Sequence, residues 1–118
     1  MQRLEPSNWI RRVTTLTASS NTYTPNNDTT DIAVISSPTA NFTIANPSGS
    51  LTTDGQSLVI RIKSGSTAYT PTWGTNYASA DVTLPTVLIA SKTVVVGLTY
   101  DATAGKWVCM ALLGTNGY

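Results

Sequence analysis

The sequence predicts an all-β domain, and three features support that class. Threonine accounts for 21 of the 118 residues, and side chains branched at Cβ fit a pleated sheet better than a helix. Several segments alternate apolar and polar residues with a period of two, whereas none sustains the helical period. Gly, Pro, Asn and Asp separate these segments at short intervals, as turns between strands require.

A chain of this length forms one domain around one core. We expect an antiparallel β-sandwich of jelly-roll type with about eight short strands over residues 13–118, preceded by an N-terminal arm at residues 1–12. The arm lacks the alternation and holds three of the seven basic residues. The predicted strands cover residues 13–18, 31–35, 41–44, 56–63, 68–73, 92–100 and 106–113.

The turns between these strands are marked by their composition. A polar stretch containing Pro25 and Asn26-Asn27-Asp28 separates the first two strands, and Ser36-Ser37-Pro38 separates the second from the third. Asn46-Pro47-Ser48-Gly49 and Asp54-Gly55 are stronger turn signals, and they precede the clearest strand. Its inward residues are predicted to be Leu58, Ile60 and Ile62, and its outward residues Val59, Arg61 and Lys63.

The last two strands are predicted to form a hairpin around residues 101–105. Both of their faces are apolar, and a strand that is apolar on both sides needs cover on both sides. A loop or a second copy of the chain could supply the second cover, and a symmetric oligomer is the favoured explanation. The residues predicted to lie at this interface are Val95, Val108, Met110 and Leu112.

Composition argues against several classes of function. Only 11% of the residues are charged and the net charge is +1, so neither nucleic acid nor a membrane is an expected partner. The absence of His removes the usual nucleophile–base pairs and the common zinc sites. We therefore expect no enzymatic activity, no cofactor and no metal.

Cysteine usage and the first residues bear on the compartment. The single Cys109 has no partner for an internal disulfide, so synthesis in a reducing cytoplasm is expected, and a mid-strand thiol is expected to be inert. No apolar run is long enough for a membrane span, and the first residues lack the apolar centre of a signal peptide.

A series of short motifs runs in order from Tyr23-Thr24-Pro25 through Phe42-Thr43-Ile44, Asp54-Gly55-Gln56, Thr72-Trp73-Gly74 and Lys106-Trp107. Together these motifs resemble a small β-sandwich domain of tailed-bacteriophage virion proteins. No single motif is specific, and the order and spacing over residues 13–113 carry the resemblance. It implies a structural protein of the virion, usually a homotrimer, made in the host bacterial cytoplasm. The head decoration or head fibre type and the tail fibre type both fit.

The N-terminal arm is the predicted attachment site for the major capsid protein or another virion protein. A large aromatic anchor beside guanidinium groups is typical of interface hot spots. The residues concerned are Arg3, Trp9, Ile10, Arg11 and Arg12. The other interpretation is that Trp9 folds back onto its own domain and the arginines are solvated.

Two further sets of residues have a functional and a structural interpretation. Tyr69, Trp73 and Tyr77 could form an aromatic platform for a host glycan, as a tail fibre would need, or Trp73 could belong to the core. Asp28 and Asp31 beside two Asn residues could suggest calcium, but they lack the spacing of a calcium loop and fit local turns better.

Overall fold

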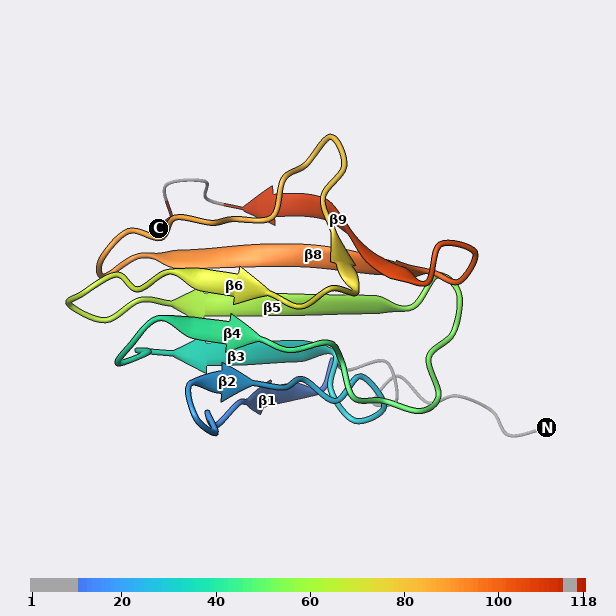
Figure 1. The fold of residues 1–118 in the computed structure, drawn as a ribbon, viewed down its shortest axis with the longest axis horizontal. Helices are drawn as coiled ribbons and strands as arrows, with labels where there is room; N and C mark the ends of the chain where they lie inside the picture. Colours follow the sequence, from blue (N-terminus) through green and yellow to red (C-terminus); the bar gives the residue numbers. More distant parts are fainter. Residues whose placement is uncertain (1–10, 114–116) are drawn as a thin grey trace.

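The computed structural model describes residues 11–113 and 117–118, and within them the chain is built from strands without a helix (Figure 1). The all-β prediction is therefore confirmed. Nine strands lie in this part of the chain. They are β1 (Val13–Thr15), β2 (Thr22–Tyr23), β3 (Ile32–Ser36), β4 (Phe42–Ile44), β5 (Ser57–Lys63), β6 (Pro71–Trp73), β7 (Tyr77–Ala78), β8 (Thr93–Asp101) and β9 (Lys106–Leu113).

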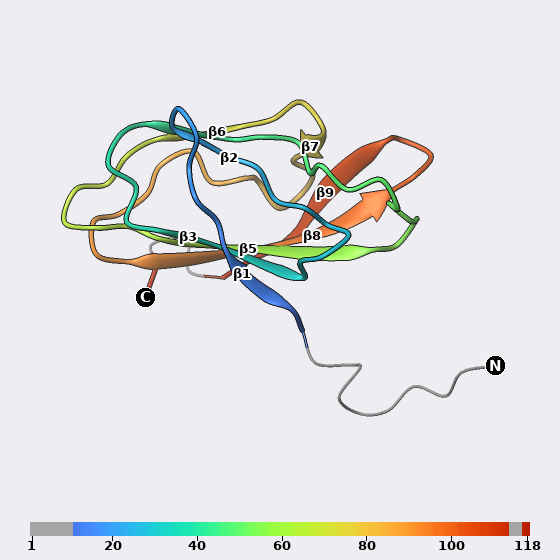
Figure 2. The ribbon, with the colours of Figure 1, turned by 90° about the horizontal axis from the view of Figure 1, so that it is seen from below.

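The strands form two sheets. A six-stranded sheet has the order β1-β3-β5-β8-β9-β7, and a three-stranded sheet has the order β2-β4-β6. Figure 2 shows the three-stranded sheet lying over one face of the six-stranded sheet. The opposite face of the six-stranded sheet, which we call the outer face, has no second sheet of the described chain against it.

The first six strands alternate between the two sheets, so the chain winds as a coil. β1, β3 and β5 pair in parallel in one sheet, and β2, β4 and β6 pair in parallel in the other. This arrangement differs from the predicted antiparallel one. Consecutive strands join different sheets here, so each strand pairs with the strand from the previous turn of the coil, which runs in the same direction.

The coil is followed by an antiparallel hairpin. β8 pairs antiparallel with β5 over seven residues and with β9 on its other side, so the predicted hairpin is confirmed. The turn between β8 and β9 is tied by a bond from the Gly105 amide to the Asp101 carbonyl. Gly105 has a positive φ of 67°, a conformation that glycine adopts without strain.

The core lies between the two sheets and consists of the inward residues of alternating strands. Leu58, Ile60 and Ile62 are fully buried, as the period of two in β5 predicted. β3 adds Ala33 and Ile35, while β4 adds Phe42, whose ring meets that of Tyr23 edge to face at 5.6 Å. Burying one of the Leu, Ile or Phe side chains stabilises the fold by roughly 1.5–3 kcal/mol relative to leaving that side chain in water.

Two strands were not predicted, and the strands predicted at residues 13–18 and 68–73 are each reduced to three residues. β2 and β7 contain only two residues each, too few to show a period of two. The expected strand at residues 68–73 is reduced to β6, so Tyr69 lies in the loop before it. Arg12, assigned to the arm, belongs to the domain, because its carbonyl accepts bonds from the amides of Asp31 and Ile32.

Candidate functional site

The middle of the outer face of the six-stranded sheet is largely apolar, while Lys63 and Thr93 lie in the row beyond it. Cross-strand pairing places Val13, Ile32, Val59, Gly97 and Ala111 in one row across five strands. The adjacent row contains Thr15, Val34, Arg61, Val95 and Leu113. Val13 is 55% exposed and Leu113 is 60% exposed. Branched apolar side chains on a sheet face without a covering layer mark a surface that a partner can bury.

A β-bulge in β9 changes which of the predicted interface residues belong to this face. The register shifts between Gly97 and Leu98, so Met110 is the extra residue on β9 and is 62% exposed. Beyond the bulge Leu112 pairs with the fully buried Val96 and packs against the core. The prediction that Leu112 shares the outer face is therefore wrong, and Leu113 takes that place.

The remaining members of that set, Val95 and Val108, do lie on the outer face. Val108 pairs with Thr99, two residues along β8 from Gly97, and is partly exposed. Val95 is also partly exposed and pairs with Arg61 on one side and Leu113 on the other. Arg61 therefore brings a positive charge into a row whose other members are Thr15 and three apolar side chains.

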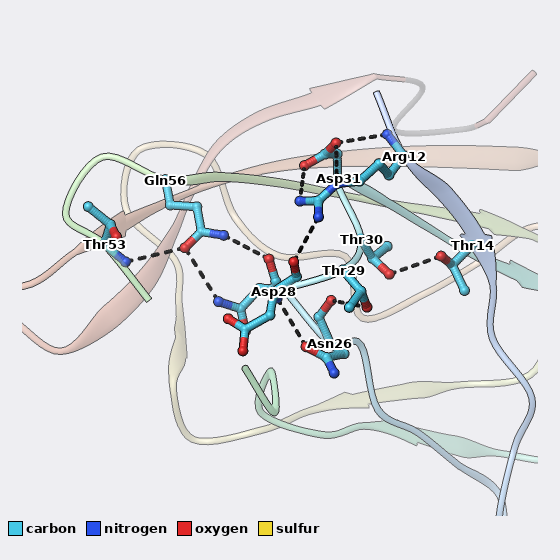
Figure 3. A network of polar contacts seen from close by, with 10 residues as sticks. Arg12, Thr14, Asn26, Asp28, Thr29, Thr30, Asp31, Thr53 and Gln56 are labelled. Carbon is cyan, nitrogen blue, oxygen red and sulfur yellow. Dashed lines mark hydrogen bonds and ion pairs between the residues drawn. The ribbon is translucent and has the colours of Figure 1, made fainter. Parts of the chain in front are cut away.

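The guanidinium of Arg12 is engaged within the domain (Figure 3). Its Nε and Nη2 donate to the two carboxylate oxygens of Asp31 at 3.2 and 3.0 Å, and its Nη1 donates to the Asp28 carbonyl at 2.7 Å. This bidentate pair also lowers the pKa of Asp31, chiefly through the side-chain hydrogen bond. The expectation that Arg12 grips a partner is not supported, because its donors already have acceptors.

The rest of the predicted arm falls mainly outside the described residues. Arg3, Trp9 and Ile10 lie there, and nothing in the structure tests their role. Arg11 is described and exposed, and its charge contributes to lowering the pKa of Asp31. Arg11 is thus a described residue of the predicted attachment site that is exposed to solvent.

The Asn-Asp stretch forms a structural network. The fully buried Asn27 accepts a bond from the Gly49 amide at 2.8 Å and donates to Thr52 Oγ1 at 3.0 Å. The carboxylate of Asp28 accepts bonds from the Ser50 and Leu51 amides, and these bonds lower its pKa. The carboxylates of Asp28 and Asp31, which the calcium interpretation would use as ligands, therefore both have protein partners. This fits the turn interpretation.

The three predicted platform aromatics do not form one surface. Tyr77 is buried and donates its hydroxyl to the Ala45 carbonyl at 2.8 Å, and burial raises its pKa. Trp73 is partly buried, donates its Nε1 to the Pro85 carbonyl at 2.8 Å and meets Tyr77 edge to face. The core interpretation of Trp73 is therefore supported. Tyr69 packs partly against the core and lines a separate pocket.

Two hollows of similar size lie on the surface. One, of about 340 Å³, is lined mainly by apolar side chains of residues 83–89 and by Leu112, and it includes the exposed Val87. The other, of about 350 Å³, lies between residues 37–39 and 65–69, and five of its seven lining residues carry a hydroxyl group. Sequence reasoning missed both, because each depends on loops that only the fold brings together.

Two remaining observations concern Cys109 and the membrane. Cys109 is buried, and desolvation raises the pKa of its thiol, as expected for a thiol that behaves as a small apolar group. Among residues 11–113 and 117–118, no helix has the length and apolar character to cross a membrane.

The chain was compared with protein-family models and with curated proteins, and it matches neither a family model nor a curated protein.

Proposed function

We propose that this chain is a structural protein of a bacteriophage virion, a capsid decoration protein that associates with copies of itself and attaches to the capsid surface. The observation that carries the self-association is the apolar outer face of the six-stranded sheet. The assignment to a virion rests on the motif resemblance over residues 13–113. The two-layered sandwich belongs to the same proposal, and the two sheets around one core support it. The parallel pairing of β1 to β6 departs from the antiparallel pairing of the expected jelly roll.

A second copy of the chain is the proposed occupant of the outer face. Copies related by a three-fold axis can each bury part of this face and form a closed ring, and most homo-oligomers have closed symmetry. The two middle rows of the face are built mainly from Val, Ile and Leu side chains, so their burial is driven mainly by removing apolar surface from water. The trimeric state comes from the resemblance.

The attachment proposal concerns residues 1–11. Arg3, Trp9, Ile10 and Arg11 retain their proposed role, while Arg12 anchors the root of the segment to Asp31. Three such segments on one trimer raise the effective concentration of each contact, so weak single contacts give tight attachment. A ligand that binds only the assembled shell also stabilises that shell by mass action.

The second candidate is a tail-fibre module that binds a host glycan. The predicted platform gives it little support, because Trp73 and Tyr77 are engaged within the domain. The observation that favours it is the hydroxyl-lined pocket beside Tyr69. The two candidates share the fold and differ in copy number, since a decoration protein is present in far more copies per virion than a fibre tip.

Sedimentation analysis of the full chain tests the self-association. Leu113→Lys places a charge on the outer face near Arg61, and we expect it to dissociate the oligomer. Leu51→Lys is the matched control, because Leu51 is also exposed, at 74%, but lies in the loop between β4 and β5. A native protein that is monomeric at micromolar concentration contradicts the proposal, as does equal association of the two variants.

Removal of residues 1–11 tests the attachment. The shortened chain keeps Arg12 and should fold, but it should no longer cosediment with purified capsids. A double variant, Trp9→Ala with Arg11→Ala, separates the side chains from the length of the segment. Retained attachment of the shortened chain would refute the role of the segment.

A further inference from the structure

The pocket beside Tyr69 lies where two loops of the coil meet. The loop between β3 and β4 and the loop between β5 and β6 leave the six-stranded sheet at the same end, because β3 and β5 are parallel neighbours in register. Figure 1 shows both loops at the left end of the molecule. Residues that are far apart in the sequence thus line an open surface hollow of about 350 Å³.

The lining of this pocket is polar and uncharged. Ser37, Thr39, Ser66 and Thr67 contribute hydroxyl groups, and Tyr69 contributes an aromatic ring. Within the described residues, none of the four Ser and Thr hydroxyls takes part in a hydrogen bond with another protein group. Each hydroxyl can donate one bond and accept two, so the pocket offers several unused donors and acceptors to a ligand.

Two hydrogen bonds from backbone amides hold the two loops in place. The Ser37 amide donates to the Lys63 carbonyl at 2.8 Å, and the Thr70 amide donates to Asn41 Oδ1 at 2.9 Å. These contacts tie the two loops together where the chain enters and leaves the pocket. A ligand therefore meets a preorganised site, which reduces the entropy lost on binding.

One of the four described non-glycine residues with a positive φ lies at this pocket. Ser37 has a positive φ of 49°, which costs a non-glycine residue about 1–3 kcal/mol. A Cβ added at Gly65 would lie 3.6 Å from the Ser37 side chain, so the two loops touch at this point. Strained residues that persist in a folded protein cluster at binding sites.

We propose that this pocket binds one uncharged sugar ring. The volume is at the small end of the range for ligand sites, which fits a single pyranose. The hydroxyl groups of a sugar can exchange hydrogen bonds with those of the pocket, and its C–H face can pack on the Tyr69 ring. No charged side chain lines the pocket, and the nearby ammonium of Lys63 donates to the Ser91 carbonyl at 2.9 Å.

The inference deepens the second candidate function and rests on it, because it names the class of sugar and the residues that would bind it. It is independent of the self-association proposal, because the pocket lies in loops at one end of the molecule and the proposed interface lies on the outer face. The shared chemistry is a neutral pyranose, either as a free sugar or as a unit of a surface polysaccharide.

NMR titration of the isotopically labelled full chain tests the site. Glucose, galactose, mannose and N-acetylglucosamine are added separately, and at least one should shift the amide signals of Ser37, Thr39 and residues 65–69. We expect a dissociation constant of roughly 1 mM, a weak affinity of about 4 kcal/mol. Neutral polysaccharides of the same sugars form a second arm, and tighter binding there identifies a polymer as the source.

Thr67→Arg is the test variant, because the long side chain fills the pocket while the exposed position spares the core. It should weaken binding at least tenfold. Thr103→Arg is the matched control in the β8–β9 turn, where the threonine is also exposed, and it should bind as the native chain does. The inference is overturned if no sugar shifts these amides, or if both variants bind equally well. Sedimentation of both variants distinguishes this result from failure of the assembly proposal.

Discussion

The buried Asn27 provides the sharpest test of how the loops are held, and the perturbation is Asn27→Ala. The substitution removes the bonds with the Gly49 amide at 2.8 Å and with Thr52 Oγ1 at 3.0 Å, together with a longer bond of 3.4 Å to Gln56 Oε1. Each of the two shorter bonds contributes about 1 kcal/mol, and the partly buried partners that lose a bond add up to about 1 kcal/mol more. We therefore expect the free energy of unfolding to fall by about 2–3 kcal/mol.

Urea unfolding followed by tryptophan fluorescence measures this loss. With a typical slope of about 2 kcal/mol per molar urea, the midpoint should fall by about 1–1.5 M. Asn26→Ala is the neighbouring control, because Asn26 is exposed and its side chain accepts a single bond, from the Asp28 amide at 3.0 Å. Its loss should stay below about 1 kcal/mol. Equal midpoints for the two variants would show that burial of Asn27 does not hold the loops.

Three further predictions concern the ion pair of Asp31, the thiol of Cys109 and the two leucines at the end of β9. The pKa of Asp31 is lowered mainly by its hydrogen bond from Arg12, so the stabilisation present above the unfolded value of 3.8 is lost as pH falls through the lower folded value; Asp31→Asn should flatten acid unfolding curves. Cys109 should react slowly with a thiol reagent until the chain unfolds, and rapid labelling of the native protein would contradict its burial. In dilute samples, Leu112→Asp should destabilise the domain by about 2 kcal/mol, while Leu113→Asp should change the unfolding midpoint little.

Local patterns in the sequence predicted the strands that are long enough to show a period. β5 alternates over seven residues, so its buried face could be identified, and the turn residues at 101–105 identified the hairpin. β1, β4 and β6 have three residues each. Such short strands do not reveal whether a neighbour runs parallel or antiparallel, so the coil remained hidden.

The candidate sites depended on contacts between distant residues. Nothing in the sequence pairs Arg12 with Asp31, and that ion pair engages one member of the predicted attachment site within the domain. The bulge at Met110 likewise moves Leu112 to the inside, although a strict alternation along β9 placed it outside. The pocket beside Tyr69 requires two loops whose proximity follows from the parallel register of β3 and β5.

The coil followed by a hairpin also has a consequence for the order of folding. β8 and β9 are joined by a short turn, so they can pair quickly, whereas each turn of the coil must first close a long connection. We expect the hairpin to form early and β5, β3 and β1 to dock onto it in that order. Synthesis releases these strands in the opposite order, with β1 leaving the ribosome first. The domain should therefore complete its folding only after β9 has emerged.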